Sequence, residues 1–347
     1  MQGVVSLLAQ GLSRAGLDVH VAAGGDLSMP PILETAMTEL PDRVTFHRLP
    51  DPSRSAGMIR WLRSLGQVVG DVSPDVLHGH GLRTALPLVA VGRRMPRRIL
   101  VTCHGIPPSD LPRTARLVRA SGVTVGAVGP GLAQDLRTRG LRPIILPNGM
   151  APAPDPIDRE VFMSSYGLDP TLPLVVVPGR LSPQKDPFTM LDATEHFDAP
   201  LAFVGDGPLR GMLEDEIERR RLEDRVIVTG WRDDARAIIG SADLLAMSSI
   251  WEGQPLVMIE AGMAGIPIVT TAARGVTGWL VNQRDALIVP VGDSLALGTA
   301  ISRALSDASL RTALIAGSTA LGKAHSIDAM IDAHLTAYAM LSASREP

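Results

Sequence analysis

The stretch Ser248–Thr271 is SSIWEGQPLVMIEAGMAGIPIVTT and carries one carboxylate inside an apolar run. Between residues 256 and 269 every residue except Glu260 is apolar, Gly or Pro. Pro255 suits the first position of a helix, where its missing N–H costs nothing, so Glu260 is expected one turn inside that helix. A buried carboxylate is costly unless it is satisfied. Glu260 is therefore expected either to pair with a neighbouring arginine or to bind the hydroxyl groups of a ligand.

The start of the same helix is a candidate anion site. Its first backbone N–H groups have no partner within the helix, and the helix dipole favours a negative charge there. These groups point back toward Glu252 and Gly253 in the preceding loop. We therefore expect a phosphate at the helix start and Glu252 beside the same pocket.

Composition and charge narrow the class of protein. The chain has 347 residues, enough for two domains, with 45% apolar and 3% aromatic residues. A net charge of −3 gives no electrostatic footprint for nucleic acid. Cys103, the single cysteine, excludes an intramolecular disulfide and fits a reducing compartment. We expect a cytoplasmic protein, with a peripheral place at the inner membrane face left open.

Strand-like runs alternate with helical patterns along the whole chain, which predicts α/β domains with parallel sheets. The runs are 18–23, 43–49, 75–80, 98–104, 123–129 and 143–148, then 172–180, 201–207, 225–231, 244–249, 266–271 and 286–293. MAPAPDP, residues 150–156, indicates a linker between the two series. We predict an N-terminal domain over 1–152, a C-terminal domain over 153–326, and a helix over 327–347 that packs back on the first domain.

The front of the chain departs from this alternation. MQGVVSLLAQGLSRAG predicts an amphipathic core helix, with Val4, Val5, Leu8 and Leu12 on one face. Only residues 1–3 precede it, whereas a doubly wound domain normally opens with a strand and a Gly-rich turn. We expect the opening strand to be missing, because the start was assigned too late or because the polypeptide is compromised.

Several residues at the ends of predicted strands are candidates for ligand binding. Arg180 and Lys185 in GRLSPQKD suit a diphosphate, although each alone fits a solvated surface equally well. Gly207 in VGDGPLRGMLE permits close backbone approach or simply a tight turn. Trp231 and Arg232 follow a third strand, where a flat base can lie, but core packing is slightly favoured for Trp231.

The remaining polar candidates have structural explanations beside functional ones. Asp233 and Asp234 are better explained by a helix cap than by a metal site. His78, His80 and His104 end strands of the first half without a supporting ligand set, which argues against zinc. His104 is the strongest substrate contact among them, with a structural role as the alternative. Arg54, Arg113 and Arg116 fit an acidic acceptor or an anionic membrane, but a solvated face is favoured.

The ordered motifs of the second half resemble glycosyltransferase family 4. GRLSPQKD is similar to the family's Gly-Arg-Leu-x-x-x-Lys segment, VGDGPLRGMLE to its Gly-x-Gly-Pro turn, and EGQPLVMIE to its pair of glutamates separated by seven residues. The resemblance implies the GT-B fold, with two facing Rossmann-like domains and a cleft between them. It further implies retaining transfer of a hexose-type sugar from a nucleoside diphosphate sugar, with no cofactor and no metal.

The resemblance also implies a role for each matching residue. Arg180 and Lys185 would hold the donor diphosphate, Glu260 the ribose hydroxyls and Glu252 the transferred sugar. His104 would lie beside that sugar. The amides of Leu256 and Val257 would complete the phosphate site, and Gly253, Gly207 and Arg232 would also bind the donor. The acceptor would be a glycan, a lipid or a small molecule.

Two other functions remain open. One is a truncated, catalytically weak homologue that binds nucleotide sugars, because the resemblance places donor-binding glycines in the opening turn and only Gly3 stands there. The other is a nucleoside diphosphate sugar epimerase, which has the same fold. The lack of extra carboxylates around His104 speaks modestly against the epimerase.

Overall fold

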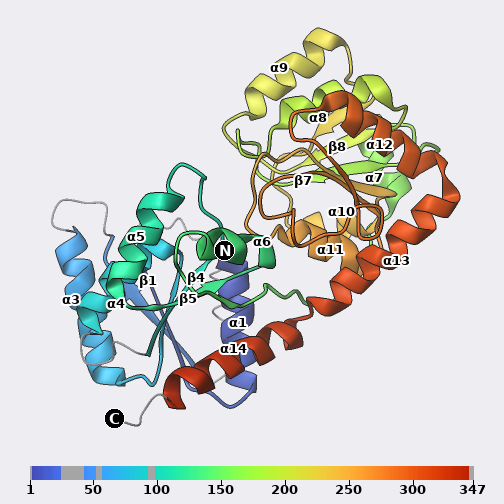
Figure 1. Cartoon of the computed structure of the whole chain (residues 1–347). Coiled ribbons are helices and arrows are strands. Elements are labelled where there is room, and N and C mark those ends of the chain that lie inside the picture. Colours follow the sequence, from blue (N-terminus) through green and yellow to red (C-terminus); the bar gives the residue numbers. More distant parts are fainter. Residues whose placement is uncertain (1, 25–42, 52–56, 93–97, 344–347) are drawn as a thin grey trace. The chain divides into compact units, whose positions relative to one another are not determined.

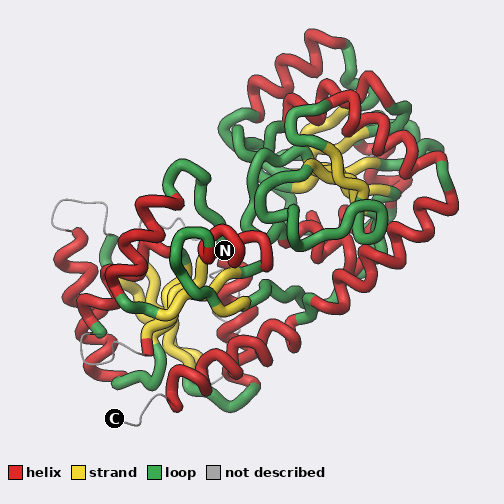
Figure 2. The backbone as a smooth tube through the Cα atoms, in the orientation of Figure 1, coloured by secondary structure: helices red, strands yellow, loops and turns green. Residues whose placement is uncertain are grey.

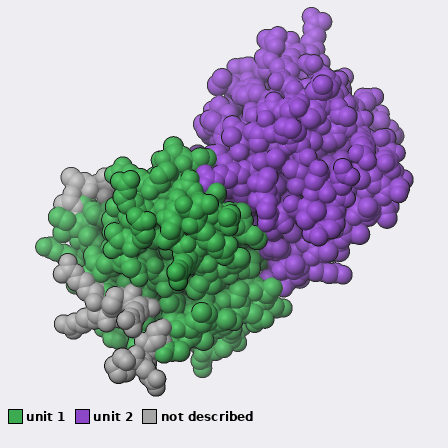
Figure 3. Space-filling view, in the orientation of Figure 1, with its two compact units in different colours: residues 1–149, 327–347 green, residues 150–326 purple. Residues whose placement is uncertain are grey.

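The computed structural model describes residues 2–24, 43–51, 57–92 and 98–343. The chain divides into two compact units, which Figure 3 colours separately. Unit 1 comprises residues 1–149 and 327–347, and unit 2 comprises residues 150–326. The polypeptide therefore leaves unit 1 near Met150 and returns to it near Ile327.

The strands confirm the predicted α/β class, because each predicted run contains one. Unit 1 has β1 (Val19–Gly24), β2 (Val44–Leu49), β3 (Leu77–His80), β4 (Ile99–Cys103), β5 (Thr124–Ala127) and β6 (Ile144–Ile145). Unit 2 has β7 (Val175–Pro178), β8 (Leu201–Val204), β9 (Val226–Val228), β10 (Leu244–Met247), β11 (Ile268–Thr271) and β12 (Leu287–Val289). All the paired strands run parallel. Figure 2 shows the strands of both units in yellow.

The sheet of unit 2 has the order β12-β11-β10-β7-β8-β9 and is covered by helices on both faces (Figure 1). Its helices are α7 (Arg159–Ser165), α8 (Pro187–Ala193), α9 (Arg210–Arg220), α10 (Ala235–Gly240), α11 (Leu256–Ala264), α12 (Ser294–Ser306) and α13 (Ala308–Ala324). Successive residues of a strand point to opposite faces of the sheet, each of which has its own core. Val176 and Leu245 pack with α7, α10 and α11, whereas Val175 and Leu244 pack with α8, α9 and α12. This two-residue alternation explains why its strands are apolar throughout.

Unit 1 is built in the same way, but its described strands form two sheets. β1 pairs with β2, and β3-β4-β5-β6 form the second sheet. The helices are α1 (Gln2–Arg14), α3 (Gly57–Val72), α4 (Ala85–Val91), α5 (Leu111–Ser121), α6 (Pro130–Arg137) and α14 (Ile327–Ala343). Ile99 and Val101 of β4 face the core shared with α3, α4 and α5, whereas Leu100 packs against α14.

Helices α1 and α14 contact each other within unit 1 (Figure 1). Val4, Leu8 and Leu12 of α1 are each at most 5% exposed, which confirms the amphipathic core helix predicted there. Arg113 and Arg116 lie on α5 with exposed side chains, and Arg54 lies outside the described residues. Among the residues described, no helix has the length and apolar character required to cross a membrane.

Candidate active site

The strand order of unit 2 places two loops side by side at the carboxyl edge of its sheet. β7 is followed outward by β8 and β9 on one side and by β10, β11 and β12 on the other. Ligands of doubly wound sheets bind where the order reverses, which here is between β7 and β10. The loop after β7 carries Arg180 and Lys185, and the loop after β10 carries Glu252.

These two loops are joined by an ion pair and two hydrogen bonds. Lys185 Nζ lies 2.7 Å from Glu252 Oε1, and the two side chains are 23% and 7% exposed. Gln184 Nε2 donates to the Trp251 carbonyl at 2.9 Å, and the Ile250 N–H donates to the Gln184 carbonyl at 2.9 Å. The structure therefore brings together the predicted lysine and one of the two predicted glutamates.

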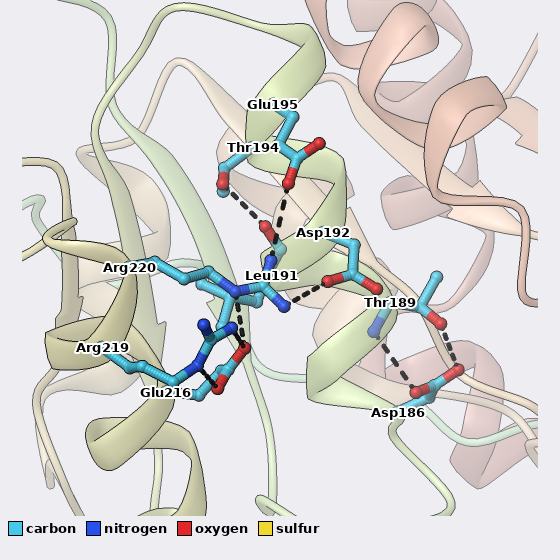
Figure 4. Close-up of polar contacts among 9 residues, drawn as sticks. All are labelled: Asp186, Thr189, Leu191, Asp192, Thr194, Glu195, Glu216, Arg219 and Arg220. Carbon is cyan, nitrogen blue, oxygen red and sulfur yellow. Dashed lines mark hydrogen bonds and ion pairs between the residues drawn. The ribbon is translucent and has the colours of Figure 1, made fainter.

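The loop that carries Lys185 is also anchored from behind. The Ser248 hydroxyl, at the end of β10, donates to the carbonyl groups of Lys185 and Asp186 at 2.9 and 2.7 Å. Asp186 caps α8, because its carboxylate accepts from the Thr189 N–H at 3.4 Å and from the Thr189 hydroxyl at 2.6 Å (Figure 4). The position of Lys185 is thus set by the backbone on both sides of it.

The helix behind this cap is tied to its neighbour by an arginine network. Arg220 of α9 lies 2.7 Å from Asp192 on α8, and 2.7 Å from Glu216 on its own helix (Figure 4). Arg219 binds the same Glu216 carboxylate at 2.6 Å. Because these side chains are partly exposed, each pair contributes only modestly to stability. The network fixes α8 and α9, the helices that follow the β7 and β8 loops.

Beside Lys185 the loops leave a small cavity of about 20 Å³, lined by Gly179, Arg180, Lys185, Ser248 and Ser249. Arg180 is exposed, and in the described ranges no side chain pairs with it. The Ser249 side chain is buried, and its hydroxyl has no hydrogen-bond partner among the described residues. A free cation and an unsatisfied buried hydroxyl at one cavity are suited to an anionic, hydrogen-bonding ligand.

Gly207 approaches a neighbouring loop closely. A Cβ at Gly207 would lie 2.2 Å from the Leu181 carbonyl oxygen, and one at Gly205 would lie 2.1 Å from that of Gly179. The Leu181 N–H donates to the Asp206 carbonyl at 3.0 Å, and the Leu209 N–H donates to the Leu181 carbonyl at 3.1 Å. These glycines therefore allow the β7 and β8 loops to pack backbone on backbone, which positions Arg180.

The start of α11 matches the predicted anion site with one correction. Pro255 occupies the N-cap position and Leu256 is the first helical residue, so the helix begins one residue later than predicted. Pro255 has no side-chain oxygen with which to cap a helix, and the structure shows no side-chain cap there. The amides of Leu256 and Val257 are thus at an uncapped helix start that follows Glu252 and the buried Gly253.

Glu260 lies one turn inside α11 and is weakly paired. Its side chain is 13% exposed, and Arg236 Nε lies 3.7 Å from its Oε1 atom. Burial raises the pKa of Glu260, and the nearby Arg236 charge offsets this only in part. Arg236 gives its hydrogen bonds to the Ala151 and Pro152 carbonyls, and its buried Nε has no hydrogen-bond partner in the described chain. Both the arginine and the ligand interpretations of Glu260 therefore persist.

The expectation that Trp231 fills the core is wrong. Trp231 is 64% exposed, and its indole N–H donates to Asp233 Oδ1 at 2.9 Å. Asp234 takes the predicted N-cap position of α10, yet its carboxylate does not cap the helix. It instead binds Arg232 through two hydrogen bonds of 2.7 and 2.6 Å, which raise the pKa of Arg232. Arg232 is thus occupied by a neighbour.

Unit 1 carries His104 directly after β4, hydrogen-bonded to another histidine. His80, at the end of β3, has its Nδ1 atom 2.9 Å from His104 Nε2. Burial lowers the pKa of His104 to about 4 and that of His80 to about 3, so both rings are neutral at pH 7. His78 is held by Tyr338 and Thr102, each at 2.7 Å. His78 therefore has a structural role, and His104, which is bonded to His80, keeps both its substrate and its structural interpretation.

Other residues of the site were not found from the sequence. Gly275 follows β11, and a Cβ there would lie 2.2 Å from the Glu252 carbonyl oxygen. The Glu252 N–H donates to the Arg274 carbonyl at 2.6 Å, so a third loop fixes this glutamate. Arg236 and Gln184 were also missed, because their partners Glu260 and Trp251 are distant in the sequence. The sequence pointed to Gly275 only through its position shortly after β11, a predicted strand of unit 2.

Two family models match the chain in succession. The model described as Glycosyltransferase Family 4 matches residues 1–154, and the model described as Glycosyl transferases group 1 matches residues 158–320. Together they cover most of both units.

Curated relatives match over shorter segments. An Escherichia coli protein, UDP-Gal:alpha-D-GlcNAc-diphosphoundecaprenol alpha-1,3-galactosyltransferase, is 28% identical over 47% of this chain and 45% of its own. The lipopolysaccharide core biosynthesis glycosyltransferase LpsD of Rhizobium meliloti is 37% identical over 39% of this chain and 40% of its own. The matched part spans less than half the length of these relatives.

Solved structures share the fold over nearly the whole chain. Anabaena Alr3699/HepE, in complex with UDP and glucose, superposes with a TM-score of 0.83 at 18% identity, covering 98% of this chain and 95% of that one. Sucrose-phosphate synthase of Thermosynechococcus elongatus also gives 0.83, at 20% identity, covering 98% and 93%. These likenesses confirm the GT-B fold class. With its two consecutive family models, the chain belongs to glycosyltransferase family 4.

Proposed function

We propose that the protein is a retaining glycosyltransferase that moves a hexose-type sugar from a nucleoside diphosphate sugar to a glycan or lipid-linked acceptor. The observation that carries the proposal is the Lys185–Glu252 ion pair across the two switch-point loops. The pair joins the loop that carries the exposed Arg180 to the loop that leads into the uncapped start of α11. Cations and helix amides of this kind stabilise the negative charge of a departing diphosphate.

Each residue has a role in this proposal. Arg180 and Lys185 bind the diphosphate and offset its charge as the glycosidic bond breaks, together with the amides of Leu256 and Val257. Glu252 exchanges its bond to Lys185 for the hydroxyl groups of the transferred sugar. Glu260, whose carboxylate has only a loose partner, accepts hydrogen bonds from the ribose.

Four further residues take supporting parts. Gly253 and Gly207 let the backbone approach the donor, and His104 contacts the transferred sugar. Arg232 faces the base of the donor once it gives up its two hydrogen bonds to Asp234. No metal has a part in the proposed mechanism, and transfer in the presence of EDTA is the test of that expectation.

The names of relatives support the donor and acceptor classes. The Escherichia coli relative is named for UDP-galactose and a diphosphoundecaprenol acceptor, and HepE was crystallised with UDP and glucose. A lipid-linked acceptor fits a cytoplasmic enzyme that contacts the inner membrane face peripherally. Co-sedimentation with anionic phospholipid vesicles, compared with neutral vesicles, tests this contact.

A donor panel tests the reaction itself. The chain is incubated with UDP-glucose, UDP-galactose, UDP-N-acetylglucosamine and GDP-mannose, and release of the nucleoside diphosphate is measured with and without lipid-linked acceptors. NMR of the first sugar product is expected to show the donor's anomeric configuration. Donor binding without release or transfer would leave the nucleotide-sugar-binding homologue, and a C2 epimer of the donor would identify an epimerase.

A further inference from the structure

Gln184, in the loop after β7, bonds to two successive residues of the loop after β10. The Ile250 N–H donates to the Gln184 carbonyl, and Gln184 Nε2 donates to the Trp251 carbonyl, each at 2.9 Å. Glu252 follows these two residues directly, and Lys185 follows Gln184. The residues that precede the two members of the ion pair are therefore bonded to one another through neutral groups.

The main chain of Glu252 is also held by the loop after β11. The Glu252 N–H donates to the Arg274 carbonyl at 2.6 Å, and Trp251 forms a parallel β-bridge with Arg274. A Cβ at Gly275 would lie 2.2 Å from the Glu252 carbonyl oxygen, so the two backbones pack closely. Two neighbouring loops thus fix the backbone around Glu252, and one of them does so through Gln184.

The side chain of Glu252 has a less durable partner. Among the described residues, Lys185 is the only side chain that bonds to the Glu252 carboxylate. A diphosphate that binds Lys185 takes this partner away, because the two anions compete for one cation. The bonds of Gln184 link neutral amide and carbonyl groups, so a phosphate does not compete for them in this way. They can therefore persist when the ion pair opens.

The contact with Trp251 requires the amide of Gln184. An amide NH₂ group donates to a carbonyl oxygen, whereas a carboxylate at this position would only accept and would add a negative charge near Glu252. An apolar side chain of the same length would leave the Trp251 carbonyl without this donor. The chemistry of the side chain, and not its size alone, is thus what joins the two loops here.

We propose that Gln184 is a positioning residue for Glu252, which keeps the glutamate in place when the donor diphosphate takes Lys185. The proposal rests on the proposed function, in which Glu252 contacts the transferred sugar. Small displacements of a group that contacts the reacting part of a substrate lower the rate strongly. Loss of the Gln184 amide should therefore impair sugar transfer much more than diphosphate binding.

The variant Gln184→Met tests this, because it keeps the length of the side chain and removes the amide. Affinity for UDP and GDP should stay within about twofold of wild type, since Ser248 holds the Lys185 main chain independently. With whichever of the four donors of the panel the wild type turns over, kcat should fall about tenfold or more, and the donor KM should change less than about threefold. Gln134→Met, at an exposed position of α6, is the matched control and should change none of these values.

A double-mutant cycle with Glu252→Gln distinguishes positioning from a merely structural role. If Gln184 acts through Glu252, adding Gln184→Met to Glu252→Gln should lower kcat by less than about twofold further. A further loss as large as that in the wild-type background would show that Gln184 affects the reaction by another route. That result would overturn the proposal.

Amide exchange tests the hold on the backbone without any reaction. In Gln184→Met, the Ile250 and Glu252 amides should exchange about tenfold faster relative to the Leu181 amide, whose hydrogen bond goes to the β8 loop. Lys185→Ala removes the ion pair and keeps Gln184, so it should leave this ratio unchanged. An unchanged ratio in Gln184→Met, or an equal loss of protection in Lys185→Ala, would overturn the proposal.

The exchange experiment also separates this proposal from the proposed function. If the wild type transfers no sugar from any donor, faster exchange in Gln184→Met alone would support the hold on Glu252 and overturn only the proposed function. Gln184→Ala, which removes the whole side chain beyond Cβ, repeats the measurement if Gln184→Met does not fold.

Discussion

Lys185 Nζ lies 2.7 Å from Glu252 Oε1, and the glutamate side chain of this pair is only 7% exposed. The charge that is proposed to bind a diphosphate is therefore neutralised by a second site residue in the structure. A ligand phosphate must compete with the Glu252 carboxylate for Lys185. The hydroxyl groups of a bound sugar must then replace the bond that Glu252 loses. The pair thus couples recognition of the diphosphate to recognition of the sugar.

Replacing Glu252 by Gln should separate these two functions. The neutral amide competes less for Lys185, so the affinity for UDP or GDP is expected to stay unchanged or to rise, by up to about tenfold, ~1.4 kcal/mol. Transfer should nevertheless fall, because the sugar contact is weakened. Calorimetry with UDP and GDP, together with a transfer assay, measures both effects.

Lys185→Ala is the matched variant on the other side of the pair. The variant loses a cation that is proposed to bind the diphosphate, so diphosphate affinity should fall at least about tenfold. It also leaves Glu252 buried without its partner, so unit 2 should lose stability. If both variants weaken UDP binding equally, the pair is structural and the proposed division of roles is wrong.

Glu260→Gln should stabilise unit 2 while it weakens donor binding. Burial raises the pKa of Glu260, so the folded state favours the protonated form, and the unfavourable effect of the charge grows as the pH rises through the folded-state pKa. At pH 8 we expect the variant to gain about 1 kcal/mol in the free energy of unfolding, since loss of function with gain of stability is typical of binding sites. Urea unfolding at pH 5 and pH 8 checks this. A loss of stability at both pH values would show that the ion pair with Arg236 dominates.

The His80–His104 pair predicts that unit 1 becomes less stable in acid. Both rings have folded-state pKa values, about 3 and about 4, below the ordinary value of 6.5. Their contribution to stability is complete above pH 6.5 and is lost as the pH falls toward 4. Each ring changes the unfolding free energy by up to about 1.4 kcal/mol per pH unit over that interval. Thermal or urea unfolding between pH 7 and pH 4 measures the slope.

The double variant His80→Asn with His104→Asn is the control for that slope. Paired carboxylates also lose stability in acid, so the informative quantity is the difference between wild type and variant. The variant should have the shallower slope between pH 6.5 and pH 4. Identical slopes would mean that the two rings are not buried as neutral partners.

Gly207→Ala should destabilise unit 2 by about 1–3 kcal/mol, because its Cβ would lie 2.2 Å from the Leu181 carbonyl oxygen. Gly211 on α9 offers a control four residues later, where a Cβ meets nothing within 4 Å. Gly211→Ala should stabilise the protein by up to about 1 kcal/mol, since alanine favours a helix. Denaturant midpoints distinguish the two, and similar effects in both variants would contradict the close packing of the loops.

The strands and the switch-point loops could be predicted because apolar runs between turn residues depend on local sequence. The two loops that carry Lys185 and Glu252 follow from the chain order of the strands, and their ends were placed within a few residues. The exposure of Trp231 could not be predicted, because an aromatic residue after a strand fits either a core or a surface. In the structure its side chain is 64% exposed, and its indole N–H donates to Asp233.

Partners that are far apart in the sequence were also beyond prediction. Arg236 reaches Glu260 because α10 lies beside α11, and the sequence names neither that neighbour nor its loose 3.7 Å distance. The bond between His80 and His104 depends on the register of β3 with β4. Local patterns identified Glu260, His80 and His104, and tertiary contacts decided what each one binds.

The Ser248 hydroxyl, which holds the carbonyl groups of Lys185 and Asp186, has a consequence for the redesign of this enzyme. A loop fixed through its own main chain cannot reshape itself around a different donor. New sugar preferences must then arise from exchanged side chains on an unchanged scaffold. Donor specificity should accordingly change with the exchange of a few side chains, without rebuilding the loops that present them.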